Sequence, residues 1–242
     1  MDAAVAQRLI ALNKEFYQTH AASFSATRTR LQPGALRVLA GVPADARVLD
    51  LGCGNGGLAA SLAAVGHQSG YVGVDFSPEL LAEAEKRVQP YTAAGYSAEF
   101  VQADLGAGDW AADVPGSFDT VFAFAVLHHI PSLELRLGFL HQVRSLLAAG
   151  GRFVHSNWQF MRSPKLAGRV QPWAGAGLDA ADVDTGDYLL DWRSGGSGLR
   201  YVHQFSEAEL AELAEQTGFV VQESFVSDGQ SADLSFYSVW SK

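Results

Sequence analysis

The apolar residues of this chain change their spacing near position 47. Before it, Val5, Leu9 and Phe16 recur at helical intervals with polar residues between them, which predicts a helix over residues 3–20. After it, short apolar runs alternate with helical segments. This alternation is typical of strands joined by right-handed crossover helices in a parallel sheet. We therefore predict an α/β fold.

Seven apolar runs have the length and composition of strands. The last two are separated by a short turn at Asp228-Gly229, so we expect them to form an antiparallel hairpin beside parallel strands. We also expect helices on both faces of this seven-stranded sheet. The predicted strands are 47–51, 71–74, 98–101, 118–125, 152–158, 219–226 and 234–240, and the predicted helices after the first are 58–65, 79–94, 133–147 and 207–217.

Residues 161–199 interrupt this rhythm with Gly, Pro, Asp and Trp. A long irregular segment inside a compact domain is usually functional, so we interpret it as a lid over the carboxyl edge of the sheet. The chain is then one domain over residues 1–242. Its parts are an N-terminal helical cap (1–44), a ligand-binding core (45–160), the lid (161–199), and a C-terminal helix and hairpin (200–242).

The composition is that of a globular protein, with 48% hydrophobic and 18% charged residues. No run of about twenty apolar residues is present, and the first residues do not resemble a signal peptide. The single cysteine, Cys53, is compatible with a reducing compartment. These features predict a cytoplasmic protein with no membrane association.

The net charge of −9 disfavours general binding to nucleic acid, because phosphate contacts normally require a basic surface. A local basic strip remains compatible with that charge. Its candidate members are Arg28, Arg30, Arg37, Arg162, Lys165 and Arg169.

A glycine-rich turn, Gly52-Cys53-Gly54-Asn55-Gly56, follows the first predicted strand. Glycines there let the backbone approach a ligand closely. Asp50, two residues before the turn, suits a cationic ligand. Asp75 ends the second predicted strand, where carboxylates of such folds accept two ribose hydroxyls.

The strand, turn and second acid together resemble the class I S-adenosylmethionine-dependent methyltransferases, over roughly residues 45–160 and the terminal hairpin. The resemblance implies a Rossmann-like fold, S-adenosylmethionine as cofactor and S-adenosylhomocysteine as product. It implies ribose contacts for Asp75, adenine contacts for Asp104 with Leu105, and stacking by Phe76. The full implied cofactor site is Asp50, Gly52, Cys53, Gly54, Asn55, Asp75, Phe76, Ser77, Asp104, Leu105 and Ala125.

The flanking motifs are similar to those of the tRNA wobble-uridine carboxymethyl methyltransferases, which esterify a uridine carboxymethyl group. The resemblance implies a tRNA acceptor. The stretch from Thr29 to Gly34 departs from that family's pattern. The similar segments are Phe24-Ser25-Ala26-Thr27-Arg28, Val126-Leu127-His128-His129, Trp158, Gly186-Asp187 to Trp192, and Arg200-Tyr201-Val202-His203-Gln204-Phe205.

Methyl transfer is an in-line displacement that depends on positioning and on excluding water. An ionised carboxylate needs no general base, whereas a hydroxyl does, and His128 and His129 are the catalytic candidates. Alternatively, one histidine packs under the adenosine and the other faces solvent. Arg28 is the candidate to hold either the cofactor's carboxylate or an acceptor carboxylate by a bidentate pair, in catalysis or acceptor binding.

Four further residues, Trp158, Trp192, Tyr201 and His203, are candidates for the wall of an acceptor pocket or, equally, for the core. The acidic lid residues match no calcium-binding loop, so we predict no metal. Three functions remain open. They are methyl-ester formation on tRNA, with or without an activating subunit, O- or N-methylation of a small molecule, and a non-catalytic cofactor-binding scaffold.

Overall fold

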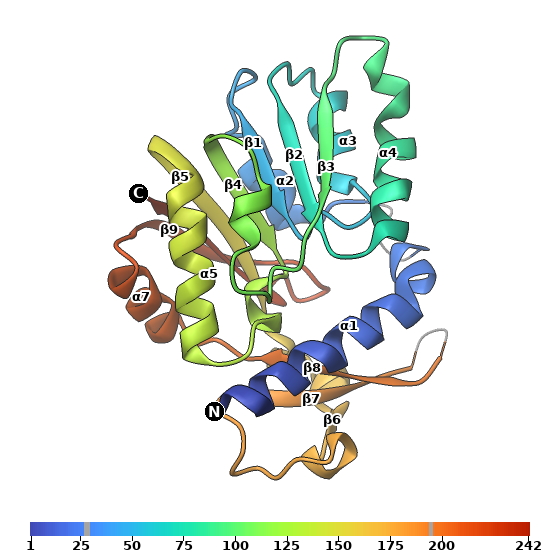
Figure 1. Ribbon diagram of the computed structural model, residues 1–242, viewed down its shortest axis with the longest axis vertical. Coiled ribbons are helices and arrows are strands. Elements are labelled where there is room, and N and C mark those ends of the chain that lie inside the picture. Colours follow the sequence, from blue (N-terminus) through green and yellow to red (C-terminus); the bar gives the residue numbers. More distant parts are fainter. Residues whose placement is uncertain (27–29, 194–195) are drawn as a thin grey trace.

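The computed structural model describes residues 1–26, 30–193 and 196–242 (Figure 1). Within these ranges, seven strands form one sheet in the order β3-β2-β1-β4-β5-β10-β9. The first five are parallel, and β10 runs antiparallel to β5 and β9, as predicted. The strands are β1 (Val48–Leu51), β2 (Tyr71–Asp75), β3 (Ala98–Gln102), β4 (Phe118–Phe124), β5 (Leu147–Trp158), β9 (Val220–Ser227) and β10 (Ser235–Ser241).

Helices cover both faces of this sheet, because neighbouring strand residues point to opposite sides. Val48 packs in a cluster with Leu58 and Val88, whereas Leu49 packs in another with Phe139. The first cluster draws on α2 (Pro33–Leu39), α3 (Gly57–Ala64) and α4 (Pro78–Thr92), and the second on α5 (Leu133–Leu146) and α7 (Glu207–Gln216). The fold is therefore the predicted Rossmann-like α/β arrangement.

A second sheet was not predicted from the sequence. Strands β6 (Val170–Gln171), β7 (Asp187–Trp192) and β8 (Gly198–His203) pair antiparallel in the order β6-β7-β8. They draw mostly on the predicted lid, and β8 crosses its boundary at residue 199. They were missed because polar and charged residues interrupt the apolar positions of β7 and β8, and Gly, Pro and Asp lie between the strands.

The N-terminal helix α1 (Ala3–Ala26) extends beyond its predicted end at residue 20 and lies across β8 (Figure 1). The Asn13 side chain holds it there, since its Oδ1 accepts from the backbone N–H of Tyr201 at 2.8 Å and its Nδ2 donates to the Tyr201 carbonyl at 3.1 Å. Asn13 therefore satisfies the exposed edge of the small sheet.

Short helices complete the described fold: η1 (Trp110–Asp113), η2 (Leu127–His129), η3 (Phe160–Arg162), α6 (Pro164–Ala167) and η4 (Trp173–Ala176). Of these, η2 follows β4 directly and carries both candidate histidines. Across the described ranges, no helix has both the length and the apolar character that a membrane crossing requires.

Candidate active site

The glycine-rich turn leaves β1 where the strand order reverses between β1 and β4. Ligands of open parallel sheets bind at such a switch point, outside the carboxyl ends of the strands. Gly52 and Gly54 have φ of 70° and 53°. A Cβ on Gly52 would lie 2.6 Å from Val126, whereas no described atom lies within 4 Å of one on Gly54. The turn is thus tightly packed at one end and open at the next glycine, as a cofactor-binding turn requires.

Asp75 is held at the mouth of this turn by backbone donors. Its carboxylate accepts from the N–H of Gly54 at 2.9 Å and from the N–H of Ser77 at 3.0 Å. Burial raises the pKa of Asp75, and these backbone hydrogen bonds oppose the rise. Each oxygen keeps a second lone pair, so the fixed carboxylate suits two ribose hydroxyls. The Ser77 hydroxyl caps α4 by accepting from the N–H of Leu80, and it donates to Glu79.

Asp50 lies beneath the turn and is 4% exposed. Its carboxylate accepts from the Tyr71 hydroxyl at 2.6 Å, and burial raises its pKa to about 7. In the described part of the chain, no cationic side chain pairs with it. Burial, with Asp50 and Asp75 nearby, also raises the pKa of the Cys53 thiol, which therefore stays neutral.

The remaining predicted cofactor residues lie around the same edge. Phe76 is half-buried, with its ring 6.5 Å from that of Tyr17 on α1. Asp104 follows β3 and pairs with Lys14 at 2.5 Å, and Leu105 packs against the core. Ala125 is exposed, directly follows β4 and has a φ of 58°.

Asn55 makes contacts within the protein. Its amide donates to the Ser25 hydroxyl at 2.9 Å and accepts from Arg87 at 2.8 Å. The Asn55 side chain therefore connects the turn to α1 and α4. These contacts support a role in fixing the shape of the turn, beside the predicted contact with the cofactor.

His129 links the edge of the large sheet to α1. Its Nε2 lies 2.7 Å from the Tyr17 hydroxyl, and its Nδ1 lies 3.1 Å from the carbonyl oxygen of Tyr201. A carbonyl oxygen only accepts, so Nδ1 carries a proton and, in the neutral ring, Nε2 accepts from Tyr17. Tyr17 and His129 thus form a pair able to pass a proton from the edge to the imidazole.

His128 is fully buried beside His129, and its Nδ1 accepts from the backbone N–H of Trp158 at 3.3 Å. Burial, with further contributions from His129 and Arg200, lowers its pKa well below the ordinary value. His128 is therefore neutral at pH 7 with its proton on Nε2. This arrangement suits a packing group or a donor better than a base.

The four predicted pocket residues divide between two places. Trp158 ends β5 and Trp192 ends β7, and both rings lie near the guanidinium of Arg200, at 4.7 Å and 5.5 Å. Phe16 of α1 adds a third ring at 5.4 Å. Arg200 was not predicted as a site residue, although it opens the Arg-Tyr-x-His segment that the sequence singled out.

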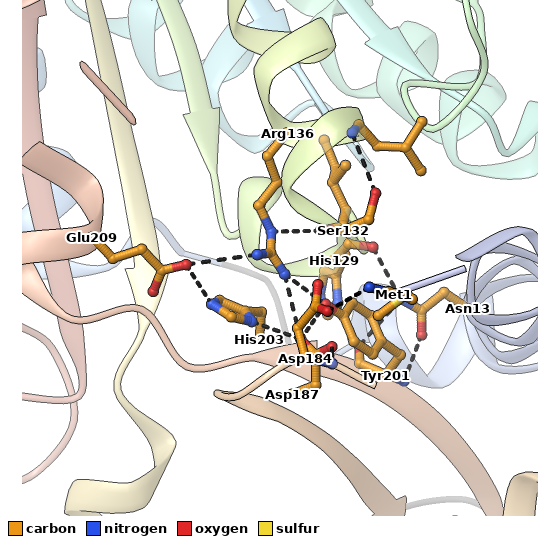
Figure 2. Close-up of polar contacts among 12 residues, drawn as sticks. Met1, Asn13, His129, Ser132, Arg136, Asp184, Asp187, Tyr201, His203 and Glu209 are labelled. Carbon is orange, nitrogen blue, oxygen red and sulfur yellow. Dashed lines mark hydrogen bonds and ion pairs between the residues drawn. The ribbon is translucent and has the colours of Figure 1, made fainter. Parts of the chain in front are cut away.

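Tyr201 and His203 instead enter a buried ionic network with Arg136, Asp187 and Glu209 (Figure 2). The Tyr201 hydroxyl donates to Asp187 at 2.7 Å, and the His203 ring nitrogens contact Asp187 and Glu209 at 2.6 Å and 2.8 Å. These partners occupy their polar atoms. We therefore propose that both residues position the pocket, in place of direct acceptor contact.

Arg28, the predicted carboxylate-binding residue, lies outside the described residues. In the described ranges, histidine, cysteine and acidic side chains form no group of three that could hold a metal ion.

Comparison with known proteins identifies the family. A profile described as a methyltransferase domain matches residues 49–153. The chain is 30% identical over 181 residues to a ubiquinone biosynthesis O-methyltransferase of Thiobacillus denitrificans, covering 74% of this chain and 67% of that protein. The chain is 36% identical over 110 residues to the enzyme of that name from Xanthomonas euvesicatoria, covering 45% of this chain and 41% of the relative. The chain thus spans about two fifths of the length of these Xanthomonas relatives.

A solved structure, magnesium protoporphyrin IX methyltransferase of Synechocystis with bound S-adenosylmethionine, superimposes with a TM-score of 0.64. It is 19% identical, and the match covers 100% of both chains, so it establishes a shared fold. The open glycine turn and the two carboxylates at the switch point agree with that fold's cofactor. The chain belongs to the S-adenosylmethionine-dependent methyltransferases.

Proposed function

We propose that this enzyme methylates an oxygen atom of a small molecule. The observation that carries the proposal is the Tyr17–His129 pair at the carboxyl edge, because a hydroxyl acceptor must lose a proton when it is methylated. The relatives from Thiobacillus and Xanthomonas are named as O-methyltransferases, which supports the same chemistry.

Different residues at the carboxyl edge of the sheet would bind different parts of the cofactor. Asp75 would hold the ribose hydroxyls, Asp50 would complement the positive charge, and Phe76 would pack against the adenine. The cofactor, when bound, supplies a methyl group on a sulfonium, which is an electrophilic carbon. Asp50 is ionised only partly at pH 7 in the free protein, so a cationic partner would lower its pKa and release a proton.

The proton of the acceptor would leave through α1. An acceptor hydroxyl that donates to the Tyr17 oxygen lets Tyr17 pass its own proton to Nε2 of His129. The Nδ1–H contact with the Tyr201 carbonyl fixes the ring orientation and stabilises the imidazolium that forms. His129 is thus the proposed base, and Tyr17 relays the proton.

The small sheet would keep water from this reaction. We propose that residues 161–199 act as a lid within a single domain of residues 1–242, with α1 closing the other side. The aromatic wall of Trp158 and Trp192 would be the acceptor side of the pocket. Excluding water strengthens the electrostatic contacts in the site and prevents hydrolysis of the methyl donor.

The second candidate acceptor is the carboxymethyl group of a tRNA wobble uridine. It is favoured by Arg200, a buried cation in the Arg-Tyr-x-His segment shared with that family. The predicted basic strip gives less support. Arg37 pairs with Glu223 and stacks over Phe225 of β9, and these contacts commit it to the large sheet.

A labelled-methyl assay distinguishes these acceptors. The enzyme is incubated with methyl-labelled S-adenosylmethionine and either a low-molecular-weight extract or unfractionated tRNA, and the products are treated with mild alkali. We expect alkali-stable label in the small-molecule fraction, because methyl ethers resist hydrolysis. Alkali-labile label in tRNA would overturn the proposal in favour of a methyl ester.

Variants tie the assay to the site. Asp75→Ala removes hydrogen bonds to a charged group, each worth about 1.5–3 kcal/mol, so loss of even one of them should lower S-adenosylhomocysteine affinity roughly tenfold to a hundredfold. The matched control is Asp109→Ala, at an exposed acid before η1, which should leave that affinity unchanged. Unchanged affinity in Asp75→Ala would contradict the assignment of the ribose site.

A further inference from the structure

Among the residues that the structure describes, Arg200 is a buried cation without a partner of opposite charge. It is 4% exposed, and its Nε is buried with no hydrogen-bond acceptor. The ion pairs among the described residues include none to its guanidinium. An arginine remains protonated in proteins, so a full positive charge is held away from water. Such burial is costly unless the charge is paired.

The register of the small sheet explains why no neighbouring acid reaches it. Arg200 pairs across the sheet with Leu190, and Trp192 pairs with Gly198, so Arg200 and Trp192 share one face. Asp191 lies between Leu190 and Trp192 in the strand and therefore points to the other face. Its Oδ2 there accepts from Arg193 at 2.7 Å.

A second unpaired donor lies beside the first. The indole Nε1 of Trp192 is buried without an acceptor, and the Trp192 ring is 5.5 Å from the Arg200 guanidinium. Indole nitrogen and guanidinium are donors only. Two adjacent buried donors without an acceptor in the described part of the chain suit an anionic ligand.

The surroundings place this site next to the proposed chemistry. Trp158 is the last residue of β5, and its ring lies 4.7 Å from the guanidinium. The backbone N–H of Trp158 donates to Nδ1 of His128. Arg200 also lowers the pKa of His128 by its charge, so the two groups are close. The rings of Phe16, Trp158 and Trp192 partly stabilise the cation through their π faces and give the site apolar walls.

We propose that Arg200, assisted by the Trp192 indole N–H, binds a carboxylate of the methyl acceptor, and that the acceptor is therefore an aromatic or unsaturated carboxylic acid. This inference rests on the proposed function and specifies its substrate class. The guanidinium would take the carboxylate in a bidentate pair, and the aromatic walls would pack on the acceptor's planar body. A lysine offers a point charge and would replace only part of this binding.

The test compares 3,4-dihydroxybenzoate with 3,4-dihydroxybenzamide, which carry the same hydroxyls and differ in charge. Binding to the enzyme saturated with S-adenosylhomocysteine is followed by tryptophan fluorescence in the wild type, Arg200→Met, Arg200→Lys and the control Arg162→Met, at an exposed arginine. We expect the acid to bind the wild type at least about tenfold more tightly than the amide, since a guanidinium binds a carboxylate more strongly than a neutral amide. Arg200→Met should abolish this preference, Arg200→Lys should restore part of it, and Arg162→Met should retain it.

Equal binding of acid and amide to the wild type, binding of neither compound, or a preference retained in Arg200→Met would overturn the inference. Labelled-methyl transfer to the same pair tests the proposed function separately. Equal transfer to both compounds would leave O-methylation standing and remove the carboxylate requirement. A binding preference for the acid without transfer to either compound would support the carboxylate site and contradict the proposed transfer to a phenolic hydroxyl.

Discussion

Two buried arginines on either side of the small sheet have opposite environments. Arg136 of α5 contacts Asp187 at 3.4 Å, Glu209 at 3.6 Å, the Tyr201 hydroxyl at 2.8 Å and the Ile130 carbonyl at 3.0 Å (Figure 2). Arg200 has aromatic rings around it and a buried nitrogen without an acceptor. The two arginines are therefore similarly buried, but Arg136 is paired with acids and Arg200 has no acid partner among the described residues.

The difference separates a structural role from a ligand-binding role. The Arg136 network joins α5, both longer strands of the small sheet and α7, so it fixes the lid on the core. Arg200 adds no such connection through hydrogen bonds. Among the described residues, Asp50 is likewise a buried ionisable group without a partner of opposite charge. In the proposed site, an acid therefore lies at the cofactor end and a cation at the acceptor end.

The largest expected effect is on the paired side. Arg136→Met leaves Asp187 buried without its cation, and breaking a buried pair in this way costs about 3–5 kcal/mol of unfolding free energy. Chemical denaturation with Arg162→Met as the surface control measures this loss. A loss below about 1 kcal/mol would show that the network is not what fixes the lid.

The unpaired acid predicts a pH dependence of stability. Asp50 has a pKa of 3.8 in the unfolded chain and about 7 in the fold. Between these values only the unfolded chain loses the proton, so rising pH lowers stability by up to about 4 kcal/mol, and the loss is complete above pH 7. Urea unfolding at several pH values should show this slope in the wild type and a clearly smaller slope in Asp50→Asn, where the raised pKa of Asp75 still contributes. The same slope in Asp50→Asn would contradict the assignment.

A smaller effect, on rate alone, is expected at α1. Tyr17→Phe removes the hydroxyl that contacts His129 and should lower kcat for a hydroxyl acceptor about a hundredfold, or about 2.7 kcal/mol in the barrier. Steady-state kinetics beside a melting curve separates this from misfolding. Unchanged kcat with unchanged stability would exclude the proton relay.

The smallest effect is expected at a surface pair. Arg37 and Glu223 are both largely exposed, so Arg37→Ala should change the unfolding free energy by less than about 1 kcal/mol. The same denaturation series measures it. A larger loss of unfolding free energy would mean that an exposed ion pair stabilises the protein much as the buried Arg136 network does, which would contradict the distinction between them.

Much of the fold was predictable from local signals. The apolar runs from Val48 onward and the turn at Asp228-Gly229 predicted the large sheet, because central strands such as β1 and β2 are buried on both faces and the last two strands form a simple hairpin. The small sheet was not predicted, since polar and charged residues interrupt the apolar positions of β7 and β8. Asn13 and Tyr201, which dock α1 on β8, are 188 positions apart.

The cofactor end of the site was easier to predict than the acceptor end. Asp50, the glycine turn and Asp75 lie on consecutive units of the chain, and their spacing carries the signal. Arg200 was missed because its neighbour Tyr201 attracted the prediction. Adjacent strand residues face opposite ways, so only the register shows that Arg200 shares a face with Trp192 and that Tyr201 faces the ionic network.

The most direct test of the distinction between the two arginines is the unfolding free energy of Arg200→Met, measured in urea with Arg136→Met and the wild type. The account predicts that Arg200→Met is as stable as the wild type to within about 1 kcal/mol, or more stable, because the substitution removes an unpaired buried charge. A loss comparable to that of Arg136→Met would contradict it and would make Arg200 a structural residue.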